Sequence, residues 1–273
     1  MVPAFNEQLR LERTLREIAD YFRRRQRDVE ILVVDDGSTD CTSDLVEALR
    51  EEVAELQLIR LPANRGKGYA VRTGVANARG DRVLFCDADG ATPIAEIERL
   101  ERAVDAGVDV AIGSRGLPQE ETHVQARLHR RLIGRSFHLL VTTLAVKGFT
   151  DTQCGFKLFR GGAAHDLFAR TRLDGFAFDV ELLVIARLRG YTVREVPVNW
   201  VHQPGSRINL VRDSLRMARD LVGIRRRLLR RSYNETQLRP LFGGSGAGWT
   251  RQESLRARRG PLAPVAPDVR VEP

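Results

Sequence analysis

Hydrophobic and polar positions alternate along the first half of the chain in a pattern that predicts strands and helices in turn. Short apolar runs, which fit buried strands, occur at Met1–Ala4, Glu30–Val34, Leu58–Leu61, Arg82–Cys86 and Val108–Gly113. Segments with helical spacing of apolar residues lie between them, at Leu9–Arg25, from Thr39 or Asp40 to about Glu55, after Gly66-Lys67-Gly68, and at Pro93–Ala106. This order predicts a mostly parallel sheet covered by helices.

The second half has a different pattern. We expect helices at His123–Val146, Phe178–Arg189 and Arg212–Arg231, and strands at Thr152–Phe159 and Thr192–Trp200. From Ser232 the periodicity is lost, and glycine- and proline-rich stretches follow. The chain is therefore predicted to consist of a folded domain over residues 1–231 and a disordered tail over residues 232–273.

Polar side chains follow several of the predicted strands. They are Asn6-Glu7, Asp35-Asp36, Asp87-Ala88-Asp89 and Ser114-Arg115. The carboxyl ends of parallel strands form the edge where such sheets bind ligands. Asp87 and Asp89 lie two positions apart after an apolar run, so their side chains point the same way if the strand continues. This pair suits a divalent cation that also holds phosphates, although a polar turn after a strand would look similar.

Composition narrows the class of partner. The chain has 273 residues and a net charge of +8, carried mostly by arginine, which suits phosphate groups in nucleic acid, lipid or substrate. Aromatic residues make up 6% and are scattered, so we expect no nucleic-acid platform. No apolar stretch is long enough to predict a transmembrane helix. The three cysteines (Cys41, Cys86 and Cys154) lack metal-ligand spacing, which favours reduced thiols in a cytosolic protein.

An ordered set of motifs carries a family resemblance. These are Pro3-Ala4-Phe5-Asn6-Glu7, Val33–Asp40, Asn64–Gly68, Asp87–Gly90, Gly113–Arg115 and Asp151–Lys157. Together they resemble the inverting family-two glycosyltransferases, and within them the dolichyl- or polyprenyl-phosphate enzymes, over about residues 1–231. The run Asp87–Thr92 (DADGAT) is similar to the β-glucosyl branch. The resemblance implies the GT-A fold, in which a mostly parallel, Rossmann-like sheet is flanked by helices.

The resemblance also implies roles for residues at the strand ends. The nucleotide sugar would contact Pro3, Ala4, Glu7, Asp35, Asp36, Lys67, Asp87 and Arg207, the last from a loop that closes over the diphosphate. Asp87 and Asp89 would hold Mg²⁺ or Mn²⁺. Each motif also has a plainer interpretation: a turn and helix cap for Asp35-Asp36, a surface turn for Gly66–Gly68, and an ordinary loop around Arg207.

The acceptor would be a polyprenyl or dolichyl phosphate. Ser114, Arg115 and Arg131 match family positions that bind its phosphate, and Asp89, Arg115 and Asp151 are the expected catalytic residues. A phosphate monoester is largely ionised near neutral pH, so a general base is less necessary than for a hydroxyl acceptor. For a hydroxyl acceptor Asp151 would be the candidate base; otherwise it orients the acceptor or sugar, or only starts a strand.

Two basic helices, at His123–Val146 and Arg212–Arg231, place arginines among Leu, Ile and Val. Such helices can lie on an anionic membrane surface or simply pack on the core. We therefore expect glucose transfer from UDP-glucose to polyprenyl phosphate by a peripheral protein on the cytoplasmic face of a membrane. The alternatives are GDP-mannose or another donor, a hydroxyl acceptor, and a non-catalytic nucleotide- or nucleic-acid-binding module.

Overall fold

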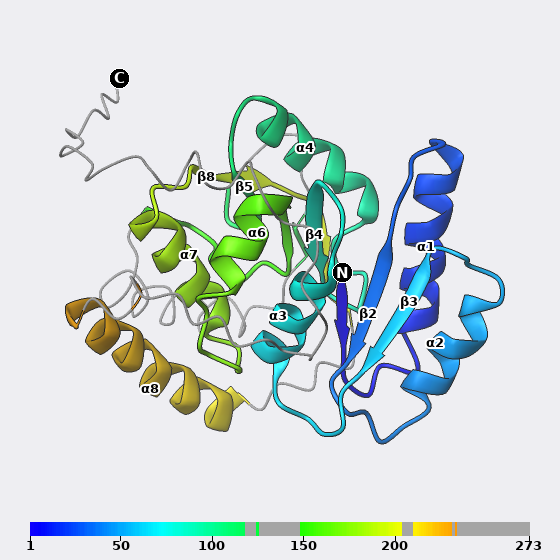
Figure 1. Ribbon diagram of the computed structural model, residues 1–273, viewed down its shortest axis with the longest axis horizontal. Coiled ribbons are helices and arrows are strands. Elements are labelled where there is room, and N and C mark those ends of the chain that lie inside the picture. Colours follow the sequence, from blue (N-terminus) through cyan, green and yellow to red (C-terminus); the bar gives the residue numbers. More distant parts are fainter. Residues whose placement is uncertain (118–123, 126–147, 204–209, 231–232, 234–273) are drawn as a thin grey trace, which may run out of the picture. The chain divides into compact units, whose positions relative to one another are not determined.

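The computed structural model describes residues 1–117, 124–125, 148–203, 210–230 and 233 (Figure 1). The chain divides into two compact units, Met1–Arg239 and Pro240–Pro273, and all described residues belong to the first. The predicted change from domain to tail at residue 232 falls between described residues and stays a prediction. Arg131 and Arg207 also lie outside the described residues.

Three parallel strands form the first half of the sheet, in the order β1 (Val2–Ala4), β2 (Ile31–Asp35) and β3 (Leu56–Arg60). The α-amino group of Met1 donates to Leu84 O at 2.8 Å, and Cys86 N donates to Met1 O at 3.1 Å. These bonds place β1 beside β4 (Arg82–Cys86), so the two halves of the sheet meet along β1 and β4.

The second half of the sheet has the order β4, β7 (Phe156–Arg160), β5 (Val110–Ser114) and β8 (Val193–Pro197). β5 and β8 are parallel, whereas β7 runs antiparallel between β4 and β5. The predicted mostly parallel sheet is confirmed, with β7 as its antiparallel member.

Helices cover both faces of the sheet (Figure 1). They are α1 (Leu11–Arg24), α2 (Thr42–Arg50), α3 (Lys67–Asn77), the 3₁₀ turn η1 (Ile94–Glu96), α4 (Ile97–Asp105), α6 (Gly161–Phe168), α7 (Phe178–Leu188) and α8 (Leu210–Leu229). Alternate residues of β2 enter two separate cores: Ile31 and Val33 pack with α1, α2 and α4, and Leu32 packs with α3, α6 and α7. Side-chain alternation along a strand produces this three-layer arrangement.

Several element boundaries differ from the sequence prediction. The strand predicted from Thr152 begins only at Phe156, because residues 151–155 form a turn. The strand predicted to Trp200 splits into β8 and β9 (Trp200–Val201) after Pro197, which has no amide to donate. Val124–Gln125 forms strand β6 beside β9, so the helix predicted from His123 was wrong at its start. The rest of that helix lies outside the described residues.

The predicted helix ends also shift. The helix expected from residue 39 or 40 to 55 spans Thr42–Arg50 only. Asp40 precedes it and accepts hydrogen bonds at Oδ1 from the amide and hydroxyl of Thr42. Pro93 has ψ of 140° and stays outside the helix that was predicted to start there. Of the helices that the structure describes, none is long and apolar enough to span a bilayer.

Candidate active site

The turn after β1 and the loop after β2 form one hydrogen-bonded unit. Asn6 has φ of +55°, and its Oδ1 accepts from the amides of Thr39 at 2.8 Å and Asp40 at 3.3 Å. In return, Asn6 N donates to Ser38 Oγ at 2.8 Å. Two motifs more than thirty residues apart are thereby fixed against each other.

The predicted nucleotide-binding residues of β1 lie within this unit. Pro3 and Ala4 are buried and pair with Val34 and Asp35 of β2. The Glu7 carboxylate is part of an ion pair with Arg10 at 2.6 Å. The structure therefore brings these residues to the same sheet edge as Asp35.

Asp35 and Asp36 are both buried, and both accept hydrogen bonds from the chain itself. Asp35 accepts from the amide of Ser38 at 2.8 Å and from the Ser43 hydroxyl. Asp36 accepts from the amides of Arg65 at 2.8 Å and Gly66 at 2.7 Å. Burial raises the pKa of Asp36, and the two amides offset this only in part. Asp36 thus anchors the loop that precedes α3.

The glycines of that loop are required by packing. A Cβ on Gly66, whose φ is +109°, would lie 2.5 Å from Asp174 O, and one on Gly68 would lie 2.5 Å from Leu173 O. Gly68 N donates to Asp174 O at 2.7 Å. The space beside both glycines is therefore filled by the backbone of the segment before α7, and the loop is held in a fixed position.

Lys67, the first residue of α3, contacts the carboxylates at the end of β4. Its Nζ lies 2.7 Å from Asp87 Oδ1. Burial lowers the pKa of Lys67, but Asp87, Asp179 and Asp89 raise it more, so the net change is upward. The ammonium group therefore balances part of the negative charge of Asp87, Asp89 and Asp179.

Asp87 and Asp89 have different surroundings. A Cβ on Gly155 would lie 2.0 Å from Asp87 Oδ2, so that carboxylate rests against the Gly155 backbone. Among the described residues, Asp89 accepts one hydrogen bond, from Ala91 N at 3.1 Å. Burial raises the pKa of Asp89, and the charge of Asp87 raises it further. A positive charge would therefore be stabilised beside this pair.

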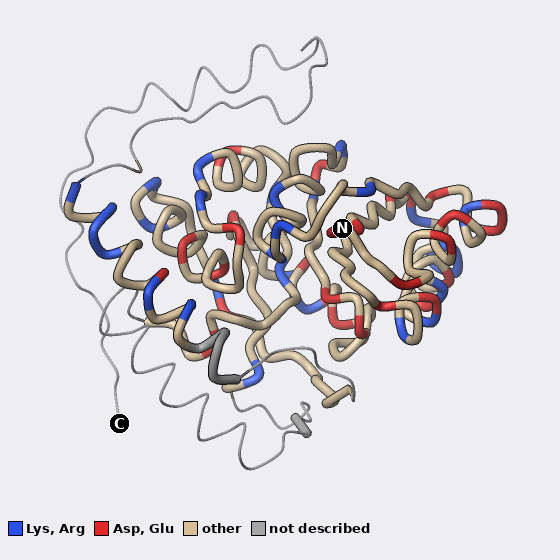
Figure 2. Tube along the Cα trace, turned by 90° about the horizontal axis from the view of Figure 1, so that it is seen from below, with Lys and Arg blue, Asp and Glu red and all other residues tan. Residues whose placement is uncertain are grey.

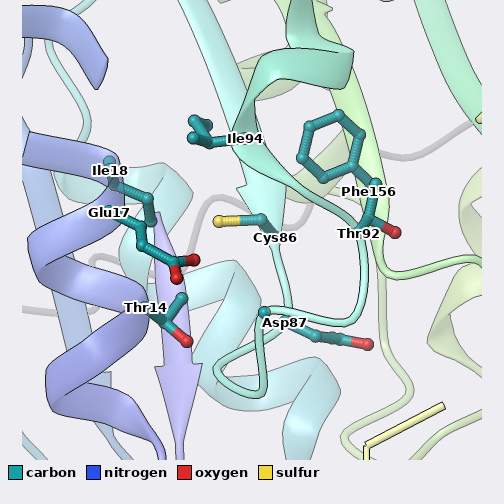
Figure 3. A pocket seen from close by; sticks show the side chains of 9 residues that line it. Thr14, Glu17, Ile18, Cys86, Asp87, Thr92, Ile94 and Phe156 are labelled. Atoms are coloured by element: carbon teal, nitrogen blue, oxygen red, sulfur yellow. The ribbon is translucent and has the colours of Figure 1, made fainter. Parts of the chain in front are cut away.

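A small pocket lies between α1 and the end of β4, on the other side of Asp87 from its carboxylate (Figure 3). Thr14, Glu17 and Ile18 line it from α1, and Cys86 and Ile94 from the β4 side. In the close view the Asp87 carboxylate points away from Thr14 and Glu17. Burial raises the pKa of the Cys86 thiol to about 11, so this cysteine is a packing group in its protonated form.

A second charged cluster lies at the end of β5. Arg115 forms two hydrogen bonds to Asp151, from Nε at 2.6 Å and from Nη2 at 2.8 Å. Glu195 accepts from the amide of Asp151 at 2.8 Å and so fixes its turn. Burial alone would raise the pKa of Asp151, but Arg115 outweighs it and the pKa is lowered. Ser114 is 1% exposed, and its Oγ has no hydrogen-bond partner among the described residues.

Sequence reasoning missed two buried acids of α7. Asp179 binds Lys157 at 2.5 Å, and Lys157 also donates to Cys154 O at 2.6 Å. Glu181 accepts from the amides of Arg172 and Leu173, both at 2.8 Å. One acid therefore holds the turn that carries Gly155, and the other holds the segment on which the glycine loop packs. Acidic residues inside the apolar run of residues 176–186 are the signal that could have identified them.

The carboxylate oxygens at the end of β4 are suitable ligands for a divalent metal ion that is bound together with a substrate. The described residues contain no complete group of three or more His, Cys, Asp or Glu side chains placed for a metal. Asp87 and Asp89 nevertheless offer hard carboxylate oxygens. Mg²⁺ is commonly bound by one or two protein carboxylates, with the remaining ligands from phosphates and water.

Comparison with known proteins gives a consistent result. The profile of Glycosyl transferase family 2 matches residues 1–168. The dolichyl-phosphate beta-glucosyltransferase of Homo sapiens is 37% identical over 254 residues, covering 88% of this chain and 78% of that protein.

Solved structures share the fold. Glucosyl-3-phosphoglycerate synthase from Mycobacterium tuberculosis in complex with UDP gives a TM-score of 0.57 at 18% identity, covering 82% of this chain and 79% of that one. A mannosyltransferase from Pyrobaculum calidifontis in complex with GDP-Man and Mn²⁺ gives a TM-score of 0.50 at 22% identity. The match covers 88% of this chain and 64% of that one. The fold is therefore GT-A, as the sequence predicted.

Proposed function

This chain belongs to glycosyl transferase family 2, and we propose that it transfers glucose from UDP-glucose to dolichyl or polyprenyl phosphate with inversion. It is a glycosyltransferase; the donor and acceptor are the proposed part. The observation that carries the proposal is the cluster of Lys67, Asp87 and Asp89 at the sheet edge where the polar motifs after β1, β2 and β5 also lie. The human relative's name supports the sugar and the lipid.

The nucleotide part of the donor is assigned to the edge formed by β1 and β2. Pro3 and Ala4 pair with Val34 and Asp35 along this edge. Glu7 and Asp36 follow the two strands in the chain. A carboxylate has about four acceptor sites, so the chain's own bonds to Asp35 and Asp36 leave capacity for a base N–H or ribose O–H. These two carboxylates also hold the surrounding loops in place.

The diphosphate is assigned to the edge between β4 and α3. Lys67 begins α3, and its ammonium group can bind phosphate oxygens, whereas the amides of Gly68 and Tyr69 already donate to Asp174 O. Asp87 and Asp89 would hold Mg²⁺ or Mn²⁺ there. That ion would supply Lewis-acid stabilisation of the charge that develops on the departing diphosphate. Arg207, outside the described residues, would supply a second cation from the segment before α8.

The acceptor phosphate is assigned to the end of β5. Arg115 is aligned by Asp151, and the unpartnered Ser114 Oγ can donate a hydrogen bond to a phosphate oxygen. Arg131 would add a further cation. An ionised phosphate oxygen attacks C1 of glucose, and the C1–O bond breaks on the opposite side, so the nucleoside diphosphate leaves with the bonding electrons. No proton has to be removed from the attacking oxygen.

The environment of Asp151 favours this acceptor over a hydroxyl. A general base works best when its pKa is near the working pH. Arg115 lowers the pKa of Asp151 and occupies both of its oxygens. Asp151 is therefore assigned to positioning Arg115.

The proposed location is the cytoplasmic face of a membrane, with α8 against the lipid. Leu215, Val222 and Leu229 are exposed by 69%, 43% and 71% and recur every seven residues, which places them on one helix face. Arginines are spaced along the same helix (Figure 2). Leu221 and Ile224 are fully buried on the opposite face. An apolar stripe among cations fits an anionic lipid surface.

Transfer of labelled sugar by the purified protein tests the chemistry. UDP-glucose and GDP-mannose are compared as donors, and polyprenyl phosphate and polyprenol as acceptors, each with Mn²⁺ and with chelator. We expect a lipid-linked product only from UDP-glucose, polyprenyl phosphate and metal. Transfer to polyprenol at a similar rate would contradict the acceptor assignment, and equal transfer from GDP-mannose would contradict the donor.

Flotation with vesicles tests the membrane surface. Replacing Leu215, Val222 and Leu229 with Gln should reduce binding to anionic vesicles about tenfold, because buried apolar area contributes to interfacial binding. Leu9 is also highly exposed, so Leu9→Gln is the control and should bind as the wild type does. Unchanged binding of the triple variant would contradict the α8 surface.

A further inference from the structure

We propose that Lys67 is the resident counter-cation of Asp87 in the metal-free protein, and that a divalent metal ion takes its place on that carboxylate. This inference rests on the metal site assigned above to Asp87 and Asp89. The new element is that Lys67 already occupies this site in the metal-free protein, and that metal binding releases it. The reasons lie in how the two sides of Asp87 are filled.

One side of Asp87 is taken by Lys67. The Nζ–Oδ1 distance of 2.7 Å is that of a direct hydrogen-bonded ion pair. The ammonium group also lies 5.3 Å from the centre of the Phe85 ring, so it sits along β4, over the residue two positions before Asp87. Lys67 therefore occupies the approach to the carboxylate from the α3 side.

The other side of Asp87 is closed by Gly155. A Cβ on Gly155 would lie 2.0 Å and 2.4 Å from the two carboxylate oxygens. The backbone is joined there too, because Asp87 N donates to Gly155 O at 2.9 Å. The carboxylate cannot move toward Gly155 to admit a second cation beside Lys67. An ion that binds Asp87 therefore approaches through the exposed 36% of its side chain, close to the ammonium group at Oδ1.

Comparison with Lys157 shows why Lys67 is exchangeable. Lys157 has a fully buried side chain and two partners, Asp179 at 2.5 Å and Cys154 O at 2.6 Å. Lys67 keeps 21% of its side chain exposed and makes a single ion pair among the described residues. Breaking one partly exposed pair costs less than removing a buried ammonium from two partners. Lys157 stays in place, and Lys67 is free to move.

Charge balance gives the direction of the exchange. Lys67 contributes one positive charge to the edge that holds Asp87 and Asp89. A divalent ion on the same carboxylates repels the ammonium group at short range. The diphosphate of the donor supplies the negative charge that Lys67 then binds. Metal affinity is therefore low before the nucleotide sugar arrives and rises when Lys67 has the diphosphate as an alternative partner.

Binding of Mn²⁺ in the absence of nucleotide tests this exchange. Lys67→Met removes the competing cation, and we expect it to bind Mn²⁺ about tenfold more tightly than the wild type in a calorimetric titration. In chelator its melting temperature should be lower than that of the wild type, and Mn²⁺ should raise it by more. Arg65→Met is the control, because it removes the same charge two positions earlier in the chain. Arg65 is directed to Asp174 at 3.7 Å and should change Mn²⁺ affinity by no more than about twofold.

The opposite change covers the case in which Lys67→Met does not fold. Lys67→Arg keeps the charge and can bind a carboxylate through two hydrogen bonds, so it should weaken Mn²⁺ binding. Equal or weaker Mn²⁺ binding by Lys67→Met, or unchanged binding by Lys67→Arg, would overturn the exchange and leave the metal site standing. If Mn²⁺ bound none of these proteins even with UDP-glucose present, the metal site itself would fail and this inference with it.

Discussion

Two strand ends of the same sheet carry aspartate pairs that look alike in sequence and differ in structure. At the end of β2, Asp35 accepts hydrogen bonds from one amide and one hydroxyl, and Asp36 accepts from two amides. Both side chains are buried. Asp87 and Asp89, after β4, are partly exposed. Asp87 is paired with a single lysine, and Asp89 accepts a bond from Ala91 N.

The difference indicates that the two strand ends have different roles, one structural and one in binding metal. A carboxylate that accepts several bonds from its own chain stabilises the loops around it. A carboxylate whose pKa is raised by burial and by a neighbouring acid, as that of Asp89 is, gains most from an added cation. The β2 end is thus the framework of the site, and the β4 end is where metal chemistry is expected. Three predictions test this division, and a fourth concerns Asp151 at the end of β5.

The largest effect is expected at Asp89. Asp89→Asn removes one metal-binding charge and should lower kcat by about 10³-fold or more, since a metal contributes several kcal/mol to charge stabilisation. Glucosyl transfer from UDP-glucose measures it. The melting temperature in chelator should stay the same or rise, because a like-charge repulsion is lost. A variant that kept a tenth of wild-type activity would contradict the role of Asp89.

Asp35 should show the reverse pattern. Asp35→Ala leaves the Ser38 amide and the Ser43 hydroxyl without their buried acceptor and should lower the free energy of unfolding by about 3 kcal/mol. Urea unfolding measures it, with Asp89→Ala as the matched control. If Asp35→Ala were as stable as the wild type, the framework role of the β2 end would be wrong.

Gly155 provides a smaller test of the β4 end. A methyl group there would overlap the Asp87 carboxylate, so Gly155→Ala should reduce kcat by about 100-fold through misplacement of a ligand. Gly162 is exposed in α6 with nothing near its added Cβ, and Gly162→Ala should keep full activity. Steady-state assays of both variants compare them. Equal activities would mean that Asp87 tolerates displacement.

The sequence allowed prediction of whatever depends on local pattern. Strand–helix alternation identified the sheet, and the motifs identified which strand ends carry polar residues. Asp87 next to Lys67 illustrates the limit: each residue was assigned to the donor, yet their ion pair depends on how α3 packs beside β4. The spacing of residues along the sequence does not predict such contacts between distant segments.

Other features were missed for the same physical reason. The antiparallel direction of β7 follows from the pairing of distant strands. The plainer interpretation of Gly66–Gly68 was a surface turn, whereas the space beside Gly66 and Gly68 is filled by the backbone at Leu173 and Asp174. Asp179 was overlooked because its partner, Lys157, is 22 residues away. Burial and partner identity are tertiary properties, and they decide the role of each charge.

The smallest expected effect concerns the pH dependence of Asp151. Its pKa lies below the ordinary value of 3.8 because of Arg115. A carboxyl with a depressed folded-state pKa contributes stability above its unfolded pKa and loses it as pH falls through the folded one. Asp151 therefore stays ionised throughout the neutral range, and its titration should not appear in the rate profile there.

We accordingly expect Asp151→Asn to lower kcat by about tenfold, through poorer alignment of Arg115, with the shape of the profile unchanged between about pH 5.5 and pH 8. An inflection near about pH 6 from the acceptor phosphate should appear in both proteins. The measurement is kcat/KM against pH with polyprenyl phosphate. Loss of a wild-type inflection in Asp151→Asn, together with a far larger fall in rate, would make Asp151 a general base. The attacking oxygen would then have to carry a proton, as the P–OH of the singly ionised phosphate does, because a fully ionised phosphate oxygen gives a base no proton to remove.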